Sequence, residues 1–306
     1  MKWINARRRH PLAGYAVVVL ALALLGGVYS VVAPDNADRA QAQAQSADAD
    51  IYEDVDISNG KQIFTQSCAS CHGMGGEGTE NGPSLVGVGA ASVDFQVSTG
   101  RMPSMDPDVQ MPRKEPVYDR EETADLAAYI SEEFGGGPAI PLDAPGSEPE
   151  RAEFEDGAAG DEAYEEALET YEAEYEAYVS GGDIDAGQTL YLTNCAQCHS
   201  WSGTGGALTD GHYAPPIGEA TPRQLYEAML TGPGAMPVFD ETTVTPEEKQ
   251  DIITHVEELQ MEADAGGIFN LNRIGQAAEG FIAWTIGIGL IIAAAVWITA
   301  KQRAHD

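Results

Sequence analysis

The sequence predicts an all-α protein in which two tandem helical domains of similar size lie between an N-terminal and a C-terminal transmembrane helix. Three observations lead to this prediction: an uncharged segment near each end of the chain, an internal repeat that contains all four cysteines, and helical spacing of apolar residues within each copy. With 306 residues, of which 43% are hydrophobic, the chain is long and apolar enough for two or three small domains.

Residues 1–33 are expected to form a basic start and a membrane-spanning helix. Residues 12–33 carry no charge over 22 positions, and a helix needs about 20 apolar residues to cross a bilayer. The competing interpretation is a cleaved secretory signal, because small residues near Ala40 resemble a cleavage site. The uncharged run exceeds the roughly 7 to 15 residues of a signal core, which favours a retained anchor.

Residues 280–306 are expected to form a second transmembrane helix with a short tail. Residues 280–300 are 21 positions without a charge, and no soluble domain follows them. Trp284 and Trp297 lie toward the two ends of this run, as tryptophans do at membrane interfaces. Residues 263–279 form a juxtamembrane segment before it.

The distribution of charge predicts a cell-membrane protein with both termini in the cytoplasm. Four basic residues precede the first span and two follow the second, which places both ends inside by the positive-inside rule. Residues 34–278, with 47 acidic and 10 basic side chains, then lie outside the cytoplasm. The net charge of −33 excludes nucleic-acid binding, which needs basic surface to neutralise phosphates.

Residues 56–72 and 183–199 are two copies of one motif, with seven identities in 17 positions. An internal repeat predicts two domains of the same fold, here residues 56–137 and 183–262, with residues 34–55 as the linker before the first. Each copy closes with an amphipathic helix. Its apolar stripe contains Leu126, Tyr129 and Ile130 in the first copy, and Ile252, Ile253, Val256 and Leu259 in the second.

The four cysteines lie in two motifs of identical spacing, Cys68-Ala69-Ser70-Cys71-His72 and Cys195-Ala196-Gln197-Cys198-His199. Two thiols three positions apart on a helical turn can each form a thioether with a vinyl group of one haem, and the adjoining histidine then binds the iron. A zinc site would need a second ligand pair in its own domain, and a thioredoxin-type pair would need a βαβ context. Neither is present, so the motifs predict two covalently bound haem c groups.

A methionine thioether is the expected sixth ligand of each iron, because it raises the reduction potential toward that of an electron carrier. In the second domain Met236 lies in a Gly- and Pro-rich loop and is followed by Pro237. Met102 has the same Met-Pro form in the first domain and is favoured there. Spacing alone leaves Met111, which also precedes a proline, as the alternative.

Four more residues are candidates for supporting roles around the two haems. The carbonyls of Pro83 and Pro215 are placed to accept a hydrogen bond from the imidazoles of His72 and His199. Arg101 is either a partner of a haem propionate or an ordinary surface arginine. His212 is at most a reserve iron ligand.

His255 lies on the predicted closing helix of the second domain. A histidine on an amphipathic helix of an acidic domain is expected to be solvated rather than to compete for iron. The sequence therefore predicts an exposed side chain for His255.

Residues 138–182 form an acidic insert between the two domains. Residues 143–185 contain 16 acidic residues and one arginine. Tyr164, Leu168, Tyr171, Tyr175 and Tyr178 recur at helical spacing, which predicts a helix that packs through this tyrosine seam. The insert is interpreted as a solvated spacer, with an acidic docking arm for a basic partner as the alternative.

The motifs around both cysteine pairs give the chain a resemblance to a known family. The matching stretches are Gly82-Pro83-Ser84-Leu85, Thr99-Gly100-Arg101-Met102-Pro103, Gly205-Gly206-Ala207-Leu208 and Met236-Pro237-Val238-Phe239. They resemble the diheme cytochrome c subunit of the actinobacterial cytochrome bc1 complex, whose domains have the cytochrome c fold. The resemblance covers both cysteine-containing domains and the last span.

This resemblance implies an electron relay within a quinol:cytochrome c reductase, without an active site of its own. The implied partners are a cytochrome b subunit, a Rieske iron-sulfur subunit that supplies electrons from menaquinol, and an aa3-type cytochrome c oxidase that receives them. A free membrane-anchored diheme carrier outside any bc1 complex is the alternative. A diheme peroxidase is disfavoured by both Met-Pro loops, because a peroxidase needs an open or displaceable sixth position on one iron.

Overall fold

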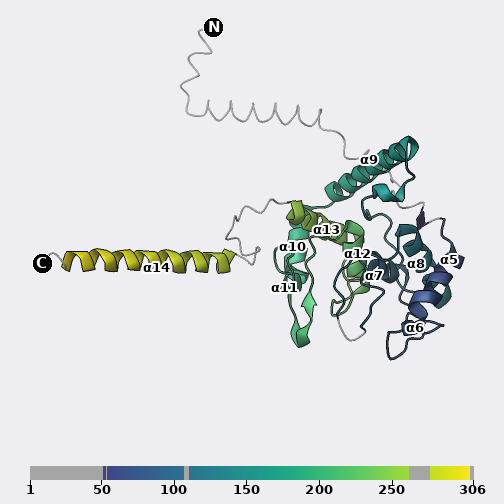
Figure 1. Cartoon of the computed structure of the whole chain (residues 1–306), viewed down its shortest axis with the longest axis horizontal. Helices are drawn as coiled ribbons and strands as arrows, with labels where there is room; N and C mark the ends of the chain where they lie inside the picture. Colours follow the sequence, from purple (N-terminus) through teal and green to yellow (C-terminus); the bar gives the residue numbers. More distant parts are fainter. Residues whose placement is uncertain (1–50, 53, 107–109, 262–275, 304–306) are drawn as a thin grey trace, which may run out of the picture. The chain divides into compact units, whose positions relative to one another are not determined.

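The computed structural model describes residues 51–52, 54–106, 110–261 and 276–303, and it is built mainly from helices (Figure 1). The predicted N-terminal span, residues 12–33, lies outside the described residues. In the first repeat the elements are α5 (Ile57–Ile63), the π-helical turn η1 (Phe64–Cys68), α6 (Ala69–His72), α7 (Ala90–Ser98) and α8 (Arg120–Phe134). In the second repeat the helices are α10 (Ile184–Asn194), α11 (Ala196–His199), α12 (Pro222–Thr231) and α13 (Pro246–Met261).

The crossing of the first and last helices organises the first repeat, where α5 packs against α8. Asp56 caps α5 because its side chain accepts from the backbone N–H groups of Ser58 and Asn59. The N–H of Asp56 in turn donates to Asp125 Oδ1 on α8 at 2.6 Å. A Cβ atom at Gly60 would lie 2.1 Å from the carbonyl oxygen of Asp125, so only glycine permits this approach.

The second repeat contains the same contacts between α10 and α13. Asp183 caps α10, and its own N–H donates to Asp251 Oδ1 at 2.7 Å. A Cβ atom at Gly187 would lie 1.9 Å from the carbonyl oxygen of Asp251. The aspartate and the glycine belong to the seven identities of the repeat, and these contacts give the physical reason for both.

Each repeat has its own apolar core, formed by the crossing helices and the helix that packs beside them. In the first repeat Phe64 is fully buried, with its ring 5.1 Å from that of Phe134 and 5.6 Å from that of Tyr129. In the second repeat Tyr191 and Ile253 are the most buried large hydrophobic side chains. The apolar stripes predicted for the closing helices are confirmed, because every residue in them is buried in or packed against these two cores.

The all-α prediction misses one small element of the second repeat. Strands β1 (Gly206–Ala207) and β2 (Tyr213–Ala214) form a two-stranded antiparallel ribbon, closed by the 3₁₀ turn η3 (Thr209–Gly211). Asp210 has φ 58° within this turn, in the left-handed region. Strands of two residues are too short to leave a periodic pattern in the sequence.

The two repeats contact each other through α7 and α12, where four polar side chains gather. Asp94 on α7 is 3% exposed and Glu227 on α12 is fully buried. The hydroxyl of Tyr52 donates to Asp94 at 2.7 Å, and the guanidinium of Arg223 lies 5.3 Å from the centre of the Tyr52 ring. The contact between the repeats is therefore partly polar and includes two carboxyl groups.

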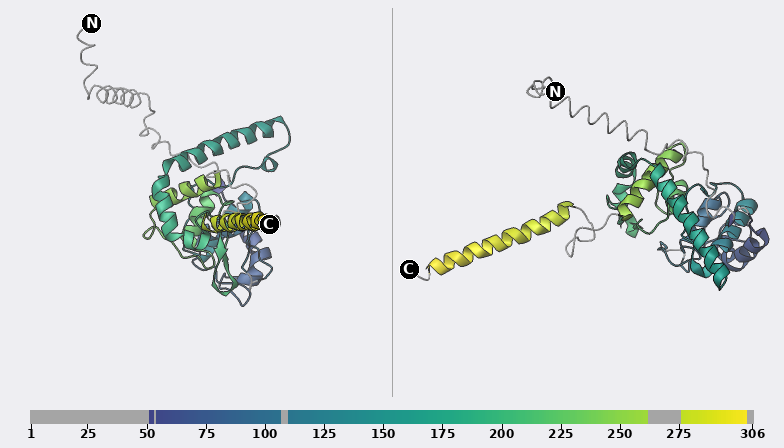
Figure 2. Two further views of the ribbon diagram at one scale, coloured as in Figure 1. Left: turned by 90° about the vertical axis from the view of Figure 1, so that its left-hand side faces the viewer. Right: turned by 90° about the horizontal axis from the view of Figure 1, so that it is seen from above.

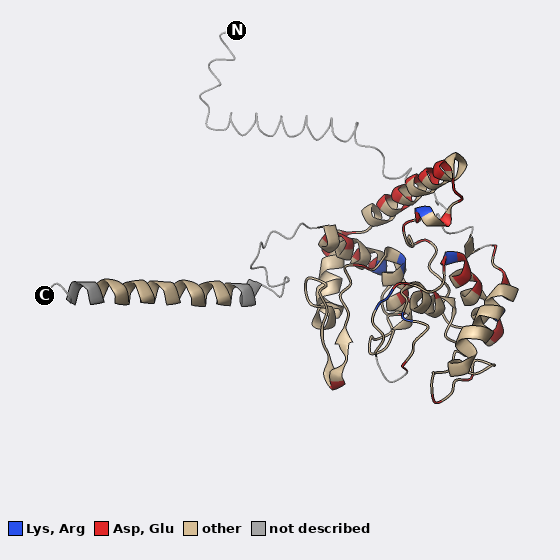
Figure 3. Ribbon diagram, viewed as in Figure 1, with Lys and Arg blue, Asp and Glu red and all other residues tan. Residues whose placement is uncertain are grey.

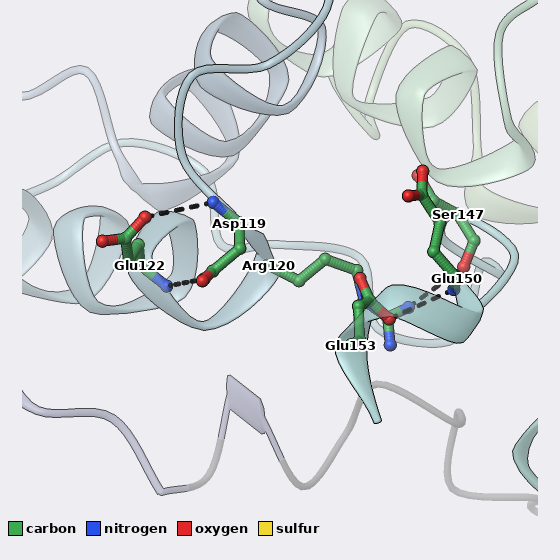
Figure 4. Close-up of polar contacts among 6 residues, drawn as sticks. All are labelled: Asp119, Arg120, Glu122, Ser147, Glu150 and Glu153. Carbon is green, nitrogen blue, oxygen red and sulfur yellow. Dashed lines mark hydrogen bonds and ion pairs between the residues drawn. The ribbon is translucent and has the colours of Figure 1, made fainter. Parts of the chain in front are cut away.

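The acidic insert is attached to the first repeat through Arg120, at the start of α8 (Figure 4). The Arg120 side chain donates to the carbonyl of Ser147 at 3.1 Å and forms an ion pair with Glu153 at 3.3 Å. Glu153 belongs to the 3₁₀ turn η2 (Arg151–Glu153). A capping box of Asp119 and Glu122 fixes the beginning of α8, so Arg120 is held at a defined position.

The helical part of the insert, α9 (Ala158–Gly181), packs against α13 of the second repeat (Figure 2). Tyr175 donates to Glu257, and the carbonyls of Tyr178 and Val179 accept from Gln250 and Thr254 at 2.9 and 3.0 Å. The tyrosine seam is confirmed in this half of the helix, where Tyr178 packs against the second core. Figure 3 shows that acidic residues cover much of the rest of α9.

One helix of the described residues is long and apolar enough to cross a membrane. It is α14 (Gln276–Arg303), in which residues 280–299 carry no charge (Figure 3). None of that stretch is buried in the rest of the structure. The C-terminal membrane-spanning helix predicted from the sequence therefore has a helical counterpart of sufficient length.

Replacing Gly187 with Ala should lower the free energy of unfolding by about 1–3 kcal/mol, because the added methyl has no room against the Asp251 carbonyl. Gly218→Ala is the matched control, since no heavy atom lies within 4 Å of a Cβ built there. Its effect should stay within about 0.5 kcal/mol. Urea unfolding followed by circular dichroism measures both, and equal losses would refute the close-crossing argument.

As the pH rises, the Glu227→Gln variant should lose less stability than the wild type. Burial, followed by the negative charge of Asp94, raises the pKa of Glu227 well above its usual value of 4.5. A carboxyl with a raised folded-state pKa stabilises the fold most below its unfolded pKa, and this contribution is lost as pH approaches the folded pKa. Between about pH 5 and about pH 8 the melting temperature of the Gln variant should fall less than that of the wild type. If the melting temperatures of the variant and the wild type fell equally with pH, Glu227 would be ionised over the whole pH range.

Candidate functional site

Each CxxCH motif follows the first helix of its repeat, and in the first repeat it begins with the last residue of the turn η1. In the first repeat the chain widens into the π-helical turn η1, whose last carbonyl bond joins the N–H of Ala69 to Phe64. In the second repeat Cys195 ends α10, with its N–H bonded to the Tyr191 carbonyl at 2.8 Å. The phenylalanine and tyrosine are core residues, so each motif is fixed directly to a core.

The first thiol of each motif is half-buried and has a raised pKa, which makes it unreactive. Burial raises the pKa of Cys68 and of Cys195 to about 11, and the second cysteine of each motif adds to the shift. Redox-active thiols and thiolate metal ligands need a lowered pKa. Among the described residues there is no cluster of three His, Cys, Asp or Glu that could hold a metal ion. These properties disfavour a thiol redox site and a zinc site.

Both motif histidines donate through Nδ1 to the proline carbonyls predicted from the sequence. His72 Nδ1 lies 2.7 Å from the Pro83 carbonyl oxygen, and His199 Nδ1 lies 3.0 Å from that of Pro215. Burial lowers the pKa of His199, with partial opposition from the bond to Pro215. A neutral imidazole that donates through Nδ1 keeps the lone pair of Nε2 for a metal ion.

The two candidate methionines lie in loops that are held by backbone hydrogen bonds. The N–H of Met102 donates to the Gln96 carbonyl at 2.9 Å, and that of Met236 donates to the Pro233 carbonyl at 3.2 Å. Met102 packs against the first core and Met236 against the second. Met111 is half-buried but does not belong to the residues that pack against either core.

Two histidines were candidates for lesser roles. His212 is exposed, in the turn of the β1–β2 ribbon. The prediction of a solvated His255 is wrong: its side chain is 4% exposed and its ring centre lies 5.5 Å from that of Tyr191. His255 is on the face of α13 that packs against α10, a long-range contact that its local sequence does not reveal.

All eight predicted ligand residues line one continuous cavity of about 1370 Å³. From the first repeat these are Cys68, Cys71, His72 and Met102, and from the second they are Cys195, Cys198, His199 and Met236. A pocket for one small molecule usually has about 300–1000 Å³, so the space exceeds the need of a single ligand. The donor set of two thiols, one imidazole and one thioether per repeat fits haem c.

The cavity wall also contains residues that the sequence analysis did not single out. Gln110 is bonded twice to the backbone of Tyr213, at 2.7 and 3.0 Å, and so joins the two repeats. Arg113 reaches Gln224 of the second repeat at 2.6 Å. These residues flank Met111-Pro112, but nothing in the local sequence indicates their contacts with the second repeat, and only the structure reveals them.

Two family models match the chain, one over each repeat. The model described as "Cytochrome c" matches residues 57–132, and the one described as "Cytochrome C oxidase, cbb3-type, subunit III" matches residues 182–256. A solved structure of the Kuenenia stuttgartiensis reducing HAO-like protein complex Kustc0457/Kustc0458 shares 16% identity with a TM-score of 0.31, over 68% of this chain and 97% of that one. A similarity of that size supports no conclusion about fold or function.

Curated relatives match nearly the whole chain. A protein of Corynebacterium diphtheriae is 36% identical over 98% of this chain and 99% of its own length. Proteins of Mycobacterium bovis and Mycobacterium leprae are each 37% identical, over 97% and 93% of this chain and 93% and 86% of their own lengths. All three are named "Cytochrome bc1 complex cytochrome c subunit". By this similarity the chain belongs to the family of cytochrome c subunits of the cytochrome bc1 complex.

Proposed function

We propose that this chain is the diheme electron relay of a menaquinol:cytochrome c reductase. The observation that supports this most directly is the single cavity lined by both CxxCH motifs and by Met102 and Met236. Cys68 and Cys71 would hold one haem covalently, and His72 and Met102 would bind its iron. Cys195 and Cys198 would hold the other, with His199 and Met236.

The protein side chains orient the ligands and tune the site. Each haem, when bound, supplies one-electron redox chemistry at its iron. The proline carbonyls fix the rotation and tautomer of His72 and His199. The thioethers of Met102 and Met236 favour a high reduction potential. Buried apolar residues in the cavity wall, such as Phe95 and Leu126, would exclude water from the first site.

The first repeat would accept electrons from the Rieske subunit after menaquinol oxidation, beside the cytochrome b subunit. The second would pass them to the copper centre of an aa3-type oxidase. A common cavity favours transfer between the two haems within one chain, without release of a soluble carrier. The chain then needs no active site of its own, because quinol and oxygen react on its partners.

The membrane arrangement follows from the sequence and agrees with α14. Residues 1–33 and 280–306 would anchor the chain with both termini in the cytoplasm and the haem domains, residues 56–137 and 183–262, outside. Residues 34–55, 138–182 and 263–279 would connect these parts. The C-terminal span would keep the relay close to its membrane partners.

Affinity purification of the full chain in mild detergent tests this function against the free-carrier alternative. We expect a cytochrome b and a Rieske protein to copurify, and a pyridine haemochrome assay to give two covalent haems per chain. Haem staining of a denaturing gel should fall by half in the double variant Cys195→Ser/Cys198→Ser. A purified chain that has two haems but no partners would instead be a free carrier.

Met102→Leu should convert one haem to the high-spin state and lower its reduction potential, because leucine offers no sulfur ligand. Met111→Leu is the matched control, since it removes the other Met-Pro thioether of the first repeat and should leave both haems unchanged. Optical spectra and redox titration of the two variants measure this. The reverse pattern would assign the ligand role to Met111.

A further inference from the structure

Two arginines of the first repeat line the cavity without a carboxylate partner among the described residues. Arg101 adjoins Met102 in the chain, and its guanidinium lies 4.9 Å from the centre of the Phe95 ring. Its Nη1 atom is buried and has no hydrogen-bond partner in the part of the chain that the structure describes. In a chain with 49 acidic and 16 basic residues, a half-buried guanidinium without an ion pair to a carboxylate is unexpected.

Arg113 is half-buried and is held in place from the other repeat. Its Nη2 donates to Gln224 Oε1 at 2.6 Å. Gln224 is 4% exposed and belongs to the capping box of α12 with Thr221, so its side chain has little freedom. Only one nitrogen of Arg113 is used in this bond, and the other donors of the planar fork stay available.

Both guanidiniums line the same cavity, and neither forms an ion pair with a carboxylate among the described residues, although Glu219 also lines the cavity. Burying a positive group is unfavourable unless it is paired, so the arrangement favours an anion in the cavity.

We propose that Arg101 and Arg113 together bind the propionate carboxylates of the haems within this cavity. This inference rests on the proposed function, because the haems supply the carboxylates. A guanidinium matches a carboxylate with two parallel hydrogen bonds, which suits both residues to this ligand class. Arg101 serves the first haem, since it adjoins Met102. Arg113 lines the same cavity and is anchored on Gln224 of the second repeat, so it would serve a propionate at the contact of the two repeats.

The pair should also raise the reduction potentials. A fixed positive charge near a haem disfavours the oxidised form, which carries one more positive charge than the reduced form. A neutral side chain in place of either arginine should therefore lower a midpoint potential. A lysine should preserve most of the potential but not the paired hydrogen bonds.

The test compares Arg101→Gln, Arg113→Gln and the corresponding Lys variants of the full chain in detergent. Arg151→Gln is the charge-matched control, because Arg151 pairs with Asp161 in the acidic insert, outside the cavity wall. The readouts are the two midpoint potentials by redox titration and the propionate bending modes in resonance Raman spectra. Haem content is measured on every sample.

The expected result is two haems in each variant, a lower potential and shifted propionate modes for both Gln variants, and a potential near that of the wild type for the Lys variants. If a Gln variant loses haem, the Lys variant at the same position is used instead. Shifted propionate modes in that variant support the inference, and unshifted modes contradict it. Potentials and propionate modes like those of Arg151→Gln in all four variants would overturn the inference. A wild-type chain without haem would refute the proposed function itself, and the two failures are thus distinguishable.

Discussion

The close crossing of the first and last helices is the constraint on which each repeat depends. Gly60 and Gly187 let a helix backbone reach a carbonyl oxygen of its partner helix, and Asp125 and Asp251 accept the N–H at the start of the first helix. The CxxCH motif follows at the other end of that helix. Its cysteines and histidine line one cavity together with the loop that carries the methionine.

The sequence allowed the parts of the structure that depend on local pattern to be predicted. The repeat, the apolar stripes of α8 and α13, the tyrosine seam and the proline acceptors for His72 and His199 all follow from spacing within one repeat or one helix. The burial of His255, the Asp94 and Glu227 pair, and Arg113 could not be predicted in this way. They depend on contacts between segments far apart in the chain, and no periodicity records such contacts.

The polar junction between the repeats differs in kind from the two cores. The cores are apolar and recur in both repeats, whereas Asp94, Tyr52, Arg223 and Glu227 are polar and gather where α7 meets α12. Buried polar groups are specific about their partners, because an unpaired one is costly. The polar junction thus defines the relative orientation of the two repeats more closely than apolar contacts alone would.

The acidic insert is fastened at both of its ends, and this limits how the two halves of the molecule can move. Arg120 secures its beginning to the first repeat, and Tyr175, Tyr178 and Val179 secure its end to α13. The insert therefore acts as a rigid connection rather than as a flexible linker. If the second repeat moved away from the first, the contacts at one end of the insert would have to break, so the rigidity of the insert limits how far the second repeat can move.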